Sequence, residues 1–321
     1  MRSIDIHAHY SPACVHRALA AGGDWHGIKL ERTSNPKHVW SVVEHIRDMD
    51  SQGVDVHVLS AQTYLYHYEH PAEVAIATSR EINDEIAEMA KTYPDRLSGL
   101  ATLPMQDVGA AISELERAVG VLGLKGVMIA DHVNGLTYDR PEFLPFFRAA
   151  EAAGALILFH QQGGESLIRE RFPRYHLRNT IGNPLDRTLT FATLVFSGLM
   201  DACPDLKVCL AHAGGYVCYG IGRMDRGWTV RSEAREKISK PPSTYLRRFY
   251  YDSLTHSEPA LRFLIDTVGA DRVLFGTDWP ADMMVDYPVA AILRMESLTQ
   301  EEKELILWRN LERLLDLPRA D

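Results

Sequence analysis

The stretch that decides the fold is Ile4-Asp5-Ile6-His7-Ala8-His9-Tyr10, at the start of the chain. Its isoleucines alternate with polar residues, which is typical of a β-strand. His7 and His9 are two residues apart, so on a strand both imidazoles project from the same face. Two such imidazoles at a strand end could bind one metal ion. Because a His-x-His pair also arises by chance, its meaning depends on what other segments bring to the same place.

The composition is that of a globular protein, with 46% hydrophobic and 24% charged residues among 321. A net charge of −9 argues against nucleic acid or an anionic membrane as the main partner. We find neither a secretory signal nor an apolar run long enough to span a membrane. No two cysteines have C-x-x-C spacing, so free thiols and a cytoplasmic location are expected. The cysteines are Cys14, Cys203, Cys209 and Cys218.

Strand patterns alternate with helical patterns along the chain. The expected strands are 4–10, 54–59, 97–103, 124–130, 155–160, 206–212, 249–254 and 272–275. Residues 11–36 are expected to form a loop, with a helix beginning at Pro36. Eight β-strand and α-helix units predict a closed (β/α)8 TIM barrel, as one domain over residues 1–321. A doubly wound open sheet would usually show a glycine-rich turn after the first strand, where this chain has His-Ala-His.

Three further residues with metal-binding side chains fall where expected strands end. His160 ends the fifth strand, His212 ends the sixth, and Asp278 follows the eighth. Catalytic groups of a barrel lie at the carboxyl ends of its strands, so these residues should meet His7 and His9. Imidazoles with a carboxylate suit one divalent ion, Zn²⁺ first and Mn²⁺ or Fe²⁺ as alternatives. Other histidines are expected in the core or on the surface, namely His26, His38, His45, His57 and His176.

These motifs resemble the amidohydrolase superfamily. The evidence is the His-x-His of the first strand, His160, His212-Ala213-Gly214-Gly215 and Gly276-Thr277-Asp278-Trp279-Pro280. More narrowly, the chain resembles the 2-amino-3-carboxymuconate-6-semialdehyde decarboxylase family. The resemblance runs nearly end to end and includes 49–55, 103–107, 222–225 and 271–276. It implies a TIM barrel with a bound metal ion.

The resemblance also implies roles for individual residues. His7, His9, His160 and Asp278 would be the metal ligands, and His212 would be the base that activates a metal-bound water. The second and fourth strands offer no lysine at their ends for a bridging carbamate, so one metal ion is expected rather than two.

The substrate-binding residues are less firmly placed. Arg223 and Arg231 resemble arginines that reach the neighbouring subunit's site and hold a substrate carboxylate, which implies a homodimer; the alternative is a pair of surface ion pairs. Arg32, or Lys29, would contact substrate from the loop after the first strand. Trp279 would lie beside the substrate or close the barrel mouth.

Two further features remain open. The loop 64–70 after the second strand could line a pocket for a planar ring or form an aromatic packing patch. His256, just past the seventh strand, is a candidate neighbour of the metal ligands.

The reaction predicted from these residues is non-oxidative decarboxylation of a small unsaturated or aromatic carboxylic acid. The same residues would serve a metal-dependent hydrolase or hydratase acting on a lactone, ester, amide or ring-cleavage product, because fold and ligands alone do not decide between them. A non-catalytic barrel is the third hypothesis, and it would predict that some of the expected ligands are missing. All of them are present.

Overall fold

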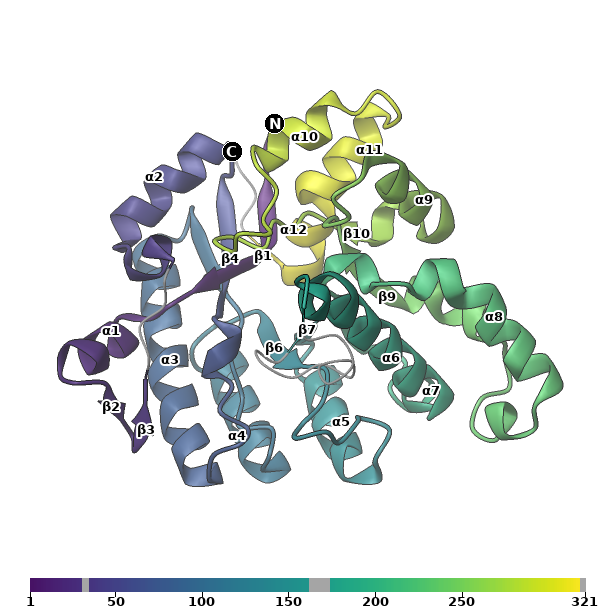
Figure 1. Ribbon diagram of the computed structural model, residues 1–321, viewed down its shortest axis with the longest axis horizontal. Helices are drawn as coiled ribbons and strands as arrows, with labels where there is room; N and C mark the ends of the chain where they lie inside the picture. Colours follow the sequence, from purple (N-terminus) through teal and green to yellow (C-terminus); the bar gives the residue numbers. More distant parts are fainter. Residues whose placement is uncertain (31–34, 162–173, 318–321) are drawn as a thin grey trace.

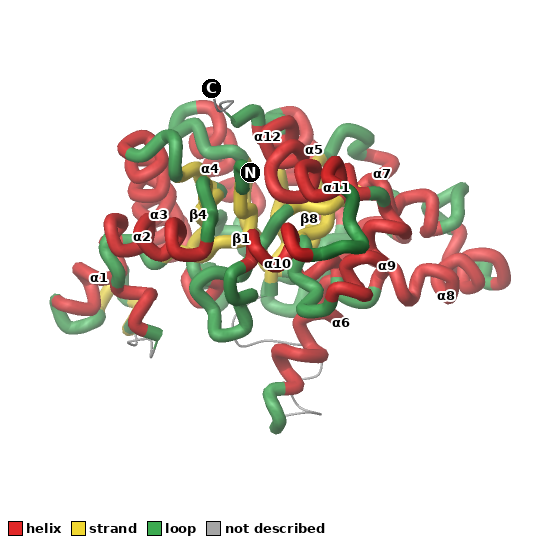
Figure 2. Tube along the Cα trace, turned by 90° about the horizontal axis from the view of Figure 1, so that it is seen from above, coloured by secondary structure: helices red, strands yellow, loops and turns green. Residues whose placement is uncertain are grey.

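The computed structural model describes residues 1–30, 35–161 and 174–317 (Figure 1). Strands occupy the centre and helices surround them, as the view from above also shows (Figure 2). The central strands run parallel and form two sheets, in each of which the strands pair in chain order. The expected (β/α)8 barrel is therefore confirmed.

The eight barrel strands end at one rim. They are β1 Ile4–Tyr10, β4 Val56–Ala61, β5 Leu97–Gly99, β6 Gly126–Ala130, β7 Leu156–His160, β8 Lys207–Leu210, β9 Phe249–Asp252 and β10 Val273–Leu274. Two sheets, β1-β4-β5 and β10-β9-β8-β7-β6, are joined by single bridges at Ala101–Val127 and Ala8–Trp279. Strands β1, β4, β6 and β7 are buried along their whole length, because the barrel interior covers one face and the helices cover the other.

The helices pack around the outside of the barrel. They are α2 Val42–Gln52, α3 Ala72–Thr92, α4 Val108–Gly120, α5 Leu144–Ala152, α6 Asn183–Phe196, α7 Leu199–Ala202, α8 Val217–Val230, α9 Glu258–Val268, α10 Pro288–Arg294, α11 Gln300–Glu304 and α12 Asn310–Leu315. Side chains of Ser41, Asp107 and Ser257 cap α2, α4 and α9 by accepting backbone N–H groups. None of the described helices is both long enough and apolar enough to cross a membrane.

The expectation of a plain loop over residues 11–36 is wrong. This segment contains helix α1, Ala13–Ala20, and a hairpin of β2, Asp24–Trp25, with β3, Ile28–Lys29. Elements this short leave no recognisable periodicity in the sequence. Pro36 begins only a 3-10 turn, Pro36–Val39. Helix α2 begins separately, after its N-cap residue Ser41.

Candidate metal centre

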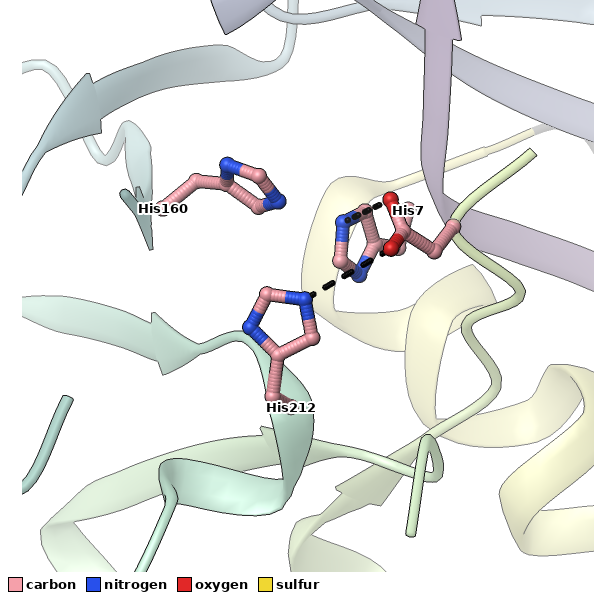
Figure 3. A group of neighbouring side chains, drawn as sticks. His7, His160 and His212 are labelled. Carbon is pink, nitrogen blue, oxygen red and sulfur yellow. Dashed lines mark ion pairs between the residues drawn. The ribbon is translucent and has the colours of Figure 1, made fainter. Parts of the chain in front are cut away.

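Side chains from β1, β7, the turn after β8 and the segment after β10 meet at the carboxyl end of the barrel. One ligand atom each of His7, His160, His212 and Asp278 lies within 4.8 Å of the others. Figure 3 shows the three imidazoles of this group turned toward one another. The ring of His9 lies 5.0 Å from that of His7 and 4.7 Å from that of His160. The structure thus brings together all five residues that the sequence singled out.

The carboxylate of Asp278 faces three imidazoles. Its Oδ1 atom lies 3.3 Å from Nε2 of His7 and 3.2 Å from Nε2 of His9, and its Oδ2 atom lies 3.7 Å from Nε2 of His212. The Nε2 atoms of His7, His9 and His160 are buried without a hydrogen-bond partner among the described residues. Buried polar atoms without partners are costly in a folded protein. A divalent ion bound by these nitrogens and by Asp278 would satisfy them, so the residues fit the metal that the sequence predicts.

The charges of the site also suit a cation. Burial alone would raise the pKa of Asp278. The neighbouring His7, His212 and His9 outweigh this effect, so the pKa of Asp278 lies well below its usual value. Burial holds the pKa of His9, His160 and His212 below the ordinary histidine value. Burial opposes the charged form of His7 too, yet Asp278 and Asp252 raise the pKa of His7 to about 10. The ionised carboxylate and the three neutral imidazoles are in the state that metal binding requires, whereas His7 must release a proton when an ion binds.

The backbone holds two of these residues in an unusual conformation. Asp278 has φ +62° and His212 has φ +53°, in the left-handed region that few non-glycine residues adopt. The N–H of Asp278 donates to the carbonyl of His7 over 2.9 Å, which pins the carboxylate beside strand β1. At Gly215, φ is +64° and any Cβ would overlap the carbonyl of Pro184. The glycine therefore lets the turn that carries His212 pack against α6.

Sequence analysis missed Asp252, the last residue of β9. Its Oδ2 atom lies 2.7 Å from Nδ1 of His7, and both side chains are fully buried. The same carboxylate accepts the backbone N–H groups of His212 over 2.9 Å and Ala213 over 2.7 Å. A carboxylate behind a metal-ligating histidine fixes its ring orientation and tautomer. Its place at a strand end was the signal that could have revealed it.

Asp5 has a comparable structural role. Its carboxylate accepts the N–H of His7 over 2.8 Å and the hydroxyl of Thr277 over 2.6 Å. It therefore ties the first strand to the segment that carries Asp278. Burial raises the pKa of Asp5 to about 6, and the hydrogen bond from Thr277 opposes that rise.

A cleft of about 560 Å³ opens onto the metal centre. His212 and Asp278 form part of its wall, with Asn183, Tyr216, His256 and Met283 beside them. His256 thus lines the same cleft as two of the predicted site residues. A larger cleft of about 1190 Å³ lies at the opposite end of the barrel, where Met1, Asp55 and Lys125 precede their strands. It contains none of the predicted site residues.

Of the other predicted substrate residues, Lys29, Arg223, Arg231 and Trp279 do not line this cleft. Arg223 and Arg231 are exposed, on α8 and just after it. The indole of Trp279 is 2% exposed, donates to Asp48 over 2.6 Å and packs 4.0 Å from the ring of His45. Lys29 is exposed on β3, and Arg32 lies outside the described residues.

The loop after β4 also differs from the pocket-lining interpretation. Tyr66 and Tyr68 are each 1% exposed and stack on one another at 5.3 Å, so they pack in the core instead. Near them is a second feature that sequence analysis missed. Arg187 of α6 is fully buried and forms an ion pair with Asp131, the residue after β6. Asp131 also accepts the hydroxyl of Thr190 over 2.8 Å.

Comparisons with known proteins agree with this fold. The amidohydrolase family profile matches residues 4–317. The 2-amino-3-carboxymuconate-6-semialdehyde decarboxylase of Dictyostelium discoideum is 33% identical over 279 residues, which are 87% of this chain and 77% of that protein. The structure of 5-carboxyvanillate decarboxylase from Sphingomonas paucimobilis has a TM-score of 0.88 at 28% identity and covers 99% of both chains. A dihydroxybenzoic acid decarboxylase from Polaromonas sp. JS666, with bound manganese and the inhibitor 2-nitroresorcinol, has a TM-score of 0.83 at 25% identity over 99% of this chain and 98% of that one.

Proposed function

We propose that this chain, a metal-dependent decarboxylase that belongs to the amidohydrolase family, releases CO₂ from a small unsaturated or aromatic carboxylic acid without an oxidant. The observation that carries the proposal is the convergence of His7, His9, His160, His212 and Asp278 beside an open cleft. The relatives support the proposal, because all three proteins described above are named as decarboxylases of unsaturated or aromatic acids.

The metal ligands that we propose are His7, His9, His160 and Asp278. Their three unpartnered Nε2 atoms and one ionised carboxylate suit Zn²⁺, and Mn²⁺ is supported by the manganese in the Polaromonas relative. When bound, the ion would supply a Lewis acid that polarises an oxygen of the substrate.

We assign proton transfer to His212. Burial lowers the pKa of His212 although Asp278 opposes the shift, so the imidazole is neutral at pH 7 and can accept a proton. In decarboxylation the carbon–carbon bond breaks, its electron pair stays on the substrate carbon, and that carbon must gain a proton. Because His212 lies in the wall of the cleft, it can take a proton from a water or substrate hydroxyl and return it to that carbon.

The proposal extends to a homodimer. Arg223 and Arg231 do not line the cleft of their own chain, so a role in substrate binding requires a neighbouring subunit. Tyr219 of α8 is 88% exposed and Val230 is 49% exposed, which supports burial of this helix against a second copy. Trp279 and Arg32 remain proposed substrate neighbours. We also propose one domain over residues 1–321 and a cytoplasmic location, which the four unpaired cysteines support.

The test is CO₂ release from a panel of acids by metal-loaded and chelated protein. The panel contains 2-amino-3-carboxymuconate 6-semialdehyde, 2,6-dihydroxybenzoate and 5-carboxyvanillate, with matched lactones and esters. We expect CO₂ from at least one acid, and we expect chelation to abolish it and Zn²⁺ or Mn²⁺ to restore it. Turnover of a lactone or ester without CO₂ would favour the hydrolase alternative. Equal rates with and without metal would exclude the proposed mechanism.

A further inference from the structure

A second group of metal-binding side chains lies outside the barrel centre. Within the part of the chain that the structure describes, His67, Glu69 and His70 form this group, in the connection between β4 and α3. It shares no residue with the centre described above. One ring nitrogen of each histidine and one carboxylate oxygen of Glu69 lie within 4.8 Å of one another.

The backbone of this group is a tight turn. The N–H of His70 donates to the carbonyl of His67 over 3.1 Å, so residues 67 and 70 face each other across the turn. Their imidazole rings are 5.6 Å apart, in an edge-to-face arrangement. His67 has φ +54°, in the left-handed region that few residues other than glycine adopt.

Side-chain amides hold the turn in place. Nε2 of Gln106 donates to the carbonyl of His67 over 3.0 Å and to that of His70 over 3.2 Å. Nδ2 of Asn134 donates to the carbonyl of Tyr68 over 2.7 Å, and the ring of Tyr68 is anchored in the core. Since these hydrogen bonds order the backbone of the turn, little further order would have to be gained on metal binding.

The side chains are suited to a cation. His67 is 4% exposed, and its Nε2 atom has no hydrogen-bond partner among the described residues. The side chains of His70 and Glu69 are 34% and 59% exposed, with their nearest ligand atoms 3.6 Å apart. They can rotate toward His67, and an ion can reach them from solvent.

We propose that His67, Glu69 and His70 bind a second divalent ion. Two imidazoles and one carboxylate suit Zn²⁺, Co²⁺ or Ni²⁺, with water in the remaining positions. All three ligands come from one four-residue turn, so the bound ion would cross-link residues within the loop after β4. The site is weaker than the barrel centre, which offers three buried imidazoles and a buried carboxylate.

The test titrates metal-free full-length protein with Co²⁺, following calorimetric stoichiometry and visible absorption. We expect wild type to bind one ion more than His70→Ala or Glu69→Gln. His9→Ala, which weakens the barrel centre, should keep the ion at the turn. His26→Ala is the matched control, because His26 also contacts a glutamate, Glu81 at 2.9 Å, but belongs to no three-ligand group among the described residues.

The expected pattern is that His26→Ala binds as many ions as wild type, whereas the His70 and Glu69 variants bind one fewer. Both altered side chains in those variants are substantially exposed, and circular dichroism checks that the fold is retained. Unchanged stoichiometry in His70→Ala and Glu69→Gln would overturn the proposal. So would a wild type that binds a single ion, lost in His9→Ala.

Discussion

The Nδ1 atom of His7 lies 2.7 Å from Oδ2 of Asp252, in a pair that solvent does not reach. Asp252 also accepts the backbone N–H groups of His212 and Ala213. One carboxylate at the end of β9 therefore orients a proposed ligand from β1 and the turn that carries the proposed proton-transfer residue. A movement of Asp252 would therefore displace both the His7 ring and the backbone of His212.

Replacing Asp252 by Asn should weaken metal binding. The substitution removes the negative charge behind His7 and brings an NH₂ group toward backbone N–H donors. Loss of such a carboxylate typically costs about 10–100-fold in metal affinity. Competition with a chromophoric chelator measures the affinity. Asp266→Asn is the control, because that carboxylate is 65% exposed and pairs only with Arg262 among the described residues. Equal affinities of the two variants would contradict the proposed role of Asp252.

The roles of His160 and His212 can be separated by metal content. His160→Gln should lose bound metal and activity together, because it removes a proposed ligand. His212→Gln should retain the metal and lose roughly 10²–10⁴-fold in kcat, the usual contribution of general acid–base catalysis. Elemental analysis and CO₂ release are measured on the same samples. Loss of metal in His212→Gln would show that His212 is a ligand, as its place within 4.8 Å of the other ligand atoms allows.

The sequence predicted the barrel and all five central residues for one physical reason. Parallel strands of a barrel end at one rim, so residues far apart in the chain, such as His7 and Asp278, can be placed together from strand ends alone. The same reasoning did not identify Asp252, because the expected strand 249–254 continued past this residue, whereas β9 ends at it. Its meaning lies in a contact with His7 across 245 positions of sequence.

Other differences have different causes. The hairpin of β2 and β3 is too short for a periodic pattern. Trp279 follows Asp278 in a motif that suggested a place beside the substrate or at the barrel mouth, and the sequence did not show that its indole donates to Asp48 and packs against His45. Side-chain direction at an irregular segment depends on such partners, and these are set by the tertiary structure.

The buried pair of Arg187 and Asp131 should be important for stability. Replacing Arg187 by Met leaves the Asp131 carboxylate buried without its cation, at a cost of about 3–5 kcal/mol. The double variant Arg187→Met with Asp131→Asn should regain part of that loss, since no unpaired charge remains. Urea denaturation of both variants gives the free energies of unfolding. A single variant as stable as wild type would show that the ion pair contributes little.

Two buried histidines away from the metal ligands should make stability depend on pH. Nε2 of His45 lies 2.9 Å from Nδ1 of His57, and neither side chain is more than 2% exposed. Burial lowers the pKa of His45 to about 3, and that of His57 well below its ordinary value. In the unfolded chain both should titrate near 6.5. Above that pH both histidines are neutral in the folded and the unfolded chain, so they do not make the free energy of unfolding depend on pH.

Below pH 6.5 the unfolded chain takes up protons that the folded protein excludes, so stability falls as the pH is lowered toward the folded pKa. For His45 alone, the loss at pH 5 is about 2 kcal/mol. Urea unfolding of chelated protein at pH 7 and pH 5 should therefore show a smaller drop for His45→Gln than for wild type. His176→Gln, at an exposed histidine, should keep the wild-type drop. If all three proteins lost the same free energy between the two pH values, His45 would not be the group that couples folding to protonation.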